Sequence, residues 1–134
     1  MLDHALETTF LAIFQSDAAF TGLHFFTGHD DEQHKLPALS ASAKSDPLAG
    51  SALVFRGELT LAVESEANDT TPAQHAARVE LMRAKLADKA AVIAAINAAG
   101  QIHLYGYALT ATDPGVEATK FRTPVTLKVG YGAP

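Results

Sequence analysis

The region from Leu53 to Leu86 changes from a two-residue hydrophobic period to a helical one. Its first part alternates apolar and polar side chains, which predicts a strand with one buried and one solvent-facing side. The residues expected to be buried are Leu53, Phe55, Leu59, Leu61 and Val63. The residues expected to face water are Arg56, Glu58, Thr60 and Glu64.

A helix is predicted to begin just after Thr71. Pro72 follows Thr71 at the first helical position, and Gln74 lies three residues after Thr71. This spacing is the signature of a capping box. A second helical piece, AAVIAAINAAG, ends at Gly100, and the two pieces form consecutive helices or one bent helix. The expected buried stripe of the first piece consists of Val79, Met82 and Leu86.

The N-terminal segment has the pattern of an amphipathic helix of about four turns. Asp3, Glu7 and Thr8 lie on its polar side, and a short strand is predicted between Gly22 and Gly28. The apolar stripe of the helix consists of Leu2, Leu6, Phe10, Ile13 and Phe14.

Residues 28–52 combine charges, small side chains, two prolines and two glycines with little periodicity. This composition predicts a long loop, with at most a short extended piece around Leu36 to Ala43. A loop of this length in a compact domain usually has a function or gains order from a partner.

The C-terminal part predicts a β-hairpin, with strands over residues 101–111 and 117–131 and a turn over residues 112–115. Pro124 has no amide hydrogen, so an edge or a bulge is expected there. Together these elements predict an α+β fold in a single domain over residues 1–134. We expect two layers: a mostly antiparallel sheet, with the N-terminal helix and the central helices packed on one face.

Composition limits the classes of function. The 134 residues carry a net charge of −5 and no cysteine, which excludes disulfides and disfavours binding to nucleic acid as the main role. Lys120, Arg122 and Lys128 are interpreted as the solvated side of a strand rather than a basic patch. No window reaches the ~18 apolar residues of a membrane span, so no membrane partner is expected.

Candidate catalytic or metal-binding residues are few. His24, His29 and His34, with Asp30, Asp31 and Glu32 among them, have the ligand types of a zinc site but not its usual spacing. A polar loop explains the same residues, and we expect neither a metal nor a cofactor. The alternative from another class is a small metal-binding enzyme or ligand-binding domain that uses the three histidines.

Other side chains have ordinary structural interpretations. His75 and His103 are expected to pack or to form hydrogen bonds on a helix and on a strand. Tyr105 and Tyr107 are expected to share one strand face and to pack against side chains of the returning strand. The alternative is that the two rings form a platform for a ligand. No serine occupies a nucleophile turn, so the protein is not expected to be an enzyme.

The order of elements, and the passage FRGELTLAVESEANDTTPAQHAARVELMRAKLADKAAVIAAIN in particular, resembles the tail terminators of tailed bacteriophages. These are also called tail completion or tail-to-head joining proteins. The resemblance implies a structural virion protein, assembled in the bacterial cytoplasm, that forms a ring, commonly a hexamer. Its implied partners are the tail tube protein, the head connector and the DNA that passes through the lumen. Another neck, connector or tube-like virion protein is the alternative within this class.

Within such a ring, loops and polar strand faces are the expected contact surfaces. An acidic loop lining the lumen would not hold the phosphates of passing DNA. The candidate interface or lumen residues are Asp30, Asp31, Glu32, Arg56, Glu58, Glu64 and Asp113.

Overall fold

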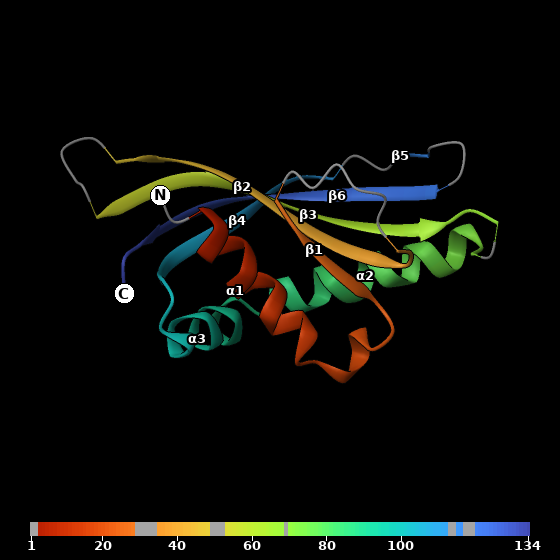
Figure 1. Ribbon diagram of the computed structural model, residues 1–134, viewed down its shortest axis with the longest axis horizontal. Helices are drawn as coiled ribbons and strands as arrows, with labels where there is room; N and C mark the ends of the chain where they lie inside the picture. The colour runs from red at the N-terminus through yellow and green to blue at the C-terminus, as the bar shows by residue number, and fades with distance from the viewer. Residues whose placement is uncertain (1–2, 29–34, 49–52, 69, 113–114, 117–119) are drawn as a thin grey trace.

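A mixed β-sheet with helices on one face forms the body of the protein (Figure 1). The computed structural model describes residues 3–28, 35–48, 53–68, 70–112, 115–116 and 120–134. The helical elements are α1 (Asp3–Gln15), the 3₁₀ turn η1 (Ala18–Phe20), α2 (Pro72–Ala87) and α3 (Lys89–Ala99). The strands are β1 (His24–Thr27), β2 (Ala38–Pro47), β3 (Val54–Glu66), β4 (His103–Thr112), β5 (Gly115–Val116) and β6 (Lys120–Gly132).

The strands lie in the order β1, β2, β3, β6, β4, with the short β5 beside β6. Only the β1–β2 pair is parallel among the described strands, and the other pairs are antiparallel. The predicted α+β class is therefore confirmed, including its mostly antiparallel sheet, its N-terminal and central helices and the antiparallel pairing of the two C-terminal strands.

The hydrophobic core lies between the helices and one face of the sheet. Alternate residues of β3 point into it, as the two-residue period predicted, and alternate residues of β6 do the same. Leu53 was expected in this set but is 66% exposed, because it precedes β3 and lies at the end of the β2–β3 hairpin. The buried alternating residues are Phe55, Leu59, Leu61, Val63, Val125, Leu127, Val129 and Tyr131.

The predicted capping box at the start of α2 is present. Gln74 N–H donates to Thr71 Oγ1 at 3.2 Å, and Thr71 N–H donates to Gln74 Oε1 at 2.9 Å. The two helical pieces are consecutive helices separated by Asp88, and α3 ends at Gly100, whose φ of 75° suits glycine.

The predicted loop over residues 28–52 is interrupted by β2, which is longer than the short extended piece that we expected. Its ten residues pair with β3 along their whole length. Leu39, Ala41, Ala43 and Ser45 are buried on the helix side. Alanine and serine have weak strand propensity, so pairing with β3 and packing against α1 decide this conformation.

Side chains of α1 and α3 form hydrogen bonds with backbone groups of β2 and β4. The Glu7 side chain is 5% exposed, although the sequence placed it on the polar side of α1, and its Oε2 accepts the Ala43 N–H at 2.7 Å. Asn97 of α3 binds Leu104 of β4 in a similar way. Such contacts satisfy polar backbone groups that strand pairing leaves open.

Pro124 was expected at an edge or a bulge, and it lies at a local gap in the pairing on one side of the interior strand β6. It pairs with Ala62 of β3, and on its other side the pairing with β4 ends at Val125 while the pairing with β5 begins at Arg122. The pairing of β6 with β4 and β5 is therefore interrupted at Pro124. None of the helices in the described ranges is long and apolar enough to cross a membrane.

Candidate functional site

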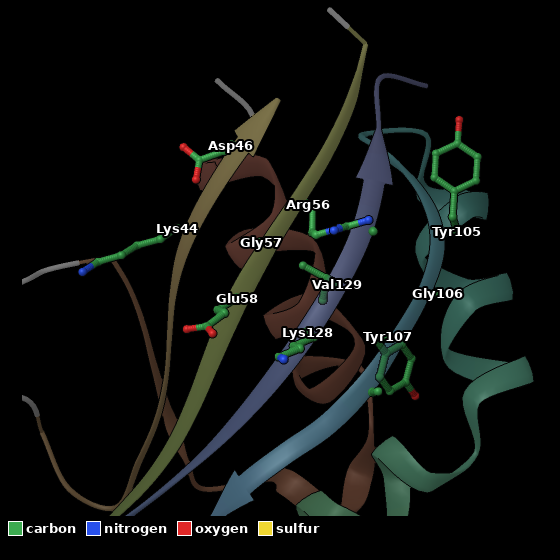
Figure 2. A pocket seen from close by; sticks show the side chains of 12 residues that line it. Lys44, Asp46, Arg56, Gly57, Glu58, Tyr105, Gly106, Tyr107, Lys128 and Val129 are labelled. Carbon is green, nitrogen blue, oxygen red and sulfur yellow. The ribbon is translucent and has the colours of Figure 1, made fainter. Parts of the chain in front are cut away.

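A broad hollow lies on the sheet face that the helices leave open (Figure 2). Its volume is about 850 Å³, and β2, β3, β6 and β4 all contribute side chains to it. We call it the open-face hollow. Its charged and aromatic lining residues are Lys44, Asp46, Arg56, Glu58, Lys128 and Tyr105.

Strand register places the charges of the hollow in two rows. Glu58 lies between Lys44 and Lys128 in one row, and Asp46 lies beside Arg56 in the next. Opposite charges that face each other across strands stabilise a sheet by roughly 0.2–1 kcal/mol per pair. The rows therefore alternate in sign, and the three basic groups exceed the two acidic groups by one charge.

The five charged side chains are exposed, and no ion pair joins them to one another or to other described residues. Their charged ends are thus hydrated and available to groups from outside. A ligand pocket for a small molecule is usually mostly apolar and enclosed. The open-face hollow is open to solvent and carries five charged side chains, which suits contact with a macromolecule or with water in a channel.

Part of the hollow has a bare backbone floor. Gly106 of β4 and Gly130 of β6 are paired in register, and a Cβ atom on either would have no neighbour within 4 Å. Packing within the chain therefore does not require glycine at these positions, and each glycine costs a strand roughly 0.5–1 kcal/mol relative to alanine. Glycine in a strand interior marks a bulge or a site that another group approaches closely.

Tyr105 and Tyr107 do not share a strand face, so that prediction is wrong. A register shift between Leu104 and Gly106 makes Tyr105 an extra residue on β4. Tyr105 is 59% exposed at the rim of the hollow, with its ring 4.7 Å from that of His103, whereas Tyr107 is 6% exposed and points into the core. The bulge reversed the alternation that the sequence suggested.

The predicted interface residues fall into three groups. Arg56 and Glu58 are exposed and line the hollow as expected. Glu64 was expected on the wet side of the same strand, but it is 2% exposed, so that expectation is wrong. The remaining candidates lie outside the described residues: Asp30, Asp31, Glu32 and Asp113.

The proposed histidine ligands are not brought together in the described structure. His24 is exposed at the start of β1, and His29 and His34 lie outside the described residues. The described ranges contain no group of three or more His, Asp or Glu side chains that could hold a metal ion.

A second polar cluster lies inside the protein around His75. His75 Nδ1 is 2.8 Å from Ser65 Oγ, and His75 Nε2 is 2.9 Å from Thr123 Oγ1. Arg78 Nη1 donates to Ser65 Oγ at 2.7 Å. Serine beside histidine is the pairing of a nucleophile and a base, but Ser65 is 0% exposed and meets no substrate. The cluster ties α2 to β3 and β6, as expected for a hydrogen-bonding His75.

Lys44 and Asp46 were not among the predicted site residues, because both lie in the segment that was predicted to be a loop. The segment ALSASAKSDP alternates small buried residues with serine, lysine and aspartate. This two-residue period was the available signal, and it is weak because the buried positions are mostly alanine.

No protein-family model matches the chain, and no curated protein matches it. Function has to be argued from the chemistry of its surfaces, because a fold class hosts many functions. Arg56 and Glu58, which the sequence placed on the exposed side of β3, both line the open-face hollow.

Proposed function

We propose that this protein is a structural subunit of a tailed-phage virion, a tail terminator that forms a ring on the tail tube and joins the tube to the head connector. The observation that carries this proposal is the one-sided covering of the sheet. Helices bury one face, and the other holds an exposed hollow with five charged side chains across four strands. The proposal also draws on the resemblance of the sequence to tail terminators.

In the proposed ring, the open-face hollow turns toward the DNA channel. DNA binds proteins mainly through its phosphates, with an affinity that rises with the number of basic groups in contact. In the hollow, Glu58 and Asp46 lie next to the basic side chains and offset most of their charge. Such a surface would let DNA pass without holding it.

The test is to mix the purified protein with tail tubes and to image them by negative-stain electron microscopy. We expect a ring at one end of each tube and an arrest of further tube growth. Mass photometry of the protein alone would give the subunit number of any preformed ring. A protein that stays monomeric and has no affinity for tubes would refute the proposal.

A further inference from the structure

The buried stripe of α2 begins with a polar side chain. His75 takes the first position of this stripe and is 7% exposed. It is the one buried residue in the first two turns of α2, all of which lie in the described ranges. The attachment of these two turns to the sheet therefore centres on a single imidazole ring. The buried residues of the helix are His75, Val79, Met82 and Leu86.

The first half of α2 has little other support. In Figure 1 it runs beneath the ends of β3 and β6, at the right, whereas α1 and α3 lie toward the other end of the helix. Its capping box joins Thr71 to Gln74, which stabilises the helix but does not attach it to the sheet. Such a segment can separate from a fold while the rest keeps its structure.

The contacts of the His75 ring suit its neutral form. Nδ1 is 2.8 Å from Ser65 Oγ of β3, and Nε2 is 2.9 Å from Thr123 Oγ1 of β6. A neutral ring has one N–H donor and one accepting nitrogen, whereas a protonated ring donates from both nitrogens. A hydroxyl that donates to the neutral ring would then have to turn its hydrogen away. Ser65 is 0% exposed and Thr123 is 5% exposed, so water has little access to either.

The charges around the ring also oppose its protonation. On α2, the Arg78 guanidinium lies beside it and donates to Ser65 Oγ at 2.7 Å. From β3 and β6, the side chains that face the ring are Ser65, Thr123 and Phe121, whose ring centroid is 5.5 Å away. The neighbouring charged residues of both strands alternate with these and point to the opposite face: Glu64, Glu66, Lys120 and Arg122. Burial, and then the charge of Arg78, lower the pKa of His75.

We propose that His75 is an acid-sensitive switch, whose protonation releases the first two turns of α2 from β3 and β6 while the remaining core keeps its structure. In the released state the ring lies in water and binds its proton more readily, so acid favours this state. The opening is regional and is distinct from unfolding of the whole chain. It is a property of the single subunit and does not depend on the proposed ring.

Amide hydrogen exchange at pH 5 and pH 7.5, followed by NMR and corrected for the intrinsic exchange rate, tests the switch. The amides of residues 75–79 should lose protection by roughly 10-fold or more at pH 5, the scale of one lost buried hydrogen-bond partner. The amides of α3 and of the interior of β3 should change much less. Equal losses in all three segments, or no loss at residues 75–79, would overturn the inference.

Two variants assign the response to His75. His75→Gln keeps one donor and one acceptor without titrating, so the protection of residues 75–79 should no longer depend on pH. Arg78→Gln keeps a donor for Ser65 but removes the neighbouring charge, so the acid response should become smaller. His103→Gln changes an exposed histidine and should respond like the unchanged protein. An acid response of residues 75–79 that persists in His75→Gln would show that another group causes it.

Discussion

The side-chain amide of Asn97 binds both backbone polar groups of Leu104. Leu104 N–H donates to Asn97 Oδ1 at 2.6 Å, and Asn97 Nδ2 donates to the Leu104 carbonyl oxygen at 3.3 Å. The end of α3 thus takes the place of a neighbouring strand at this point of β4, on the side away from β6. Glu7 fills part of a similar role beside β2, where its Oε2 accepts the Ala43 N–H.

Asn97→Ala should lower the free energy of unfolding by about 1–3 kcal/mol, because it leaves two backbone groups without a partner. Asn97→Asp keeps an acceptor for the Leu104 N–H but puts a carboxylate oxygen beside the Leu104 carbonyl, so it should also destabilise. Urea unfolding followed by circular dichroism measures both changes. Gln101→Ala, on an exposed side chain, is the control and should change stability by less than about 0.5 kcal/mol.

His75 should make the protein less stable in mild acid. Burial, and then the charge of Arg78, lower the pKa of His75 below 6.5. The unfolded chain therefore binds a proton more readily than the folded chain, and the free energy of unfolding falls as the pH decreases below about 6.5. A protonated ring would also place a second positive charge close to Arg78, since both side chains bind Ser65 Oγ.

Thermal melts between pH 5 and pH 8 test this prediction. His75→Phe should remove this part of the acid dependence, and at pH 8 it should cost about 1–3 kcal/mol because Ser65 and Thr123 lose their partner. His103→Gln, on an exposed strand position, is the control and should leave the acid dependence in place. A His75→Phe curve parallel to that of the unchanged protein would contradict the assignment.

Two buried tyrosines should make the protein sensitive to alkali. Burial raises the pKa of Tyr107 and of Tyr131 to about 12 each. Since an unfolded tyrosine titrates near 10, the unfolded state loses its protons first, and stability falls between about pH 10 and pH 12. Tyr131→Phe should make this fall less steep, and Tyr105→Phe should not; denaturant titrations at several pH values measure the slope.

Glu58→Lys should make the proposed channel surface hold DNA. Glu58 lies between Lys44 and Lys128, so the change produces a row of three lysines. We expect rings that assemble normally but eject DNA more slowly and bind it with a stronger salt dependence. Glu80→Lys makes the same change on exposed α2 and is the matched control. Normal ejection from Glu58→Lys virions would argue against a channel position for the hollow.

Chelation should leave the protein unchanged. The sequence offered His24, His29 and His34 as a possible metal site, and we predict that no tightly held metal is present. Elemental analysis of the purified protein should show no stoichiometric metal, and EDTA should not shift its melting temperature. A stoichiometric divalent metal would favour the metal-binding alternative instead.

The sequence by itself predicted the elements whose signals are local. The capping box at Thr71, the stop at Gly100 and the alternating residues of β3 and β6 depend on neighbours within a few positions, so they could be read directly. Arg56 and Glu58 were placed on the exposed face for the same reason.

Tertiary structure decided what depends on distant partners. β2 is a strand because β3 pairs with its alanines and serines, and Glu64 is buried although its position in β3 suggested the exposed side. The bulge at Tyr105 moved an aromatic ring from the core side to the rim of the hollow. Periodicity reports only which side of an element a residue takes, whereas burial and register depend on segments that are far apart in the chain. The open-face hollow exists only once those segments meet.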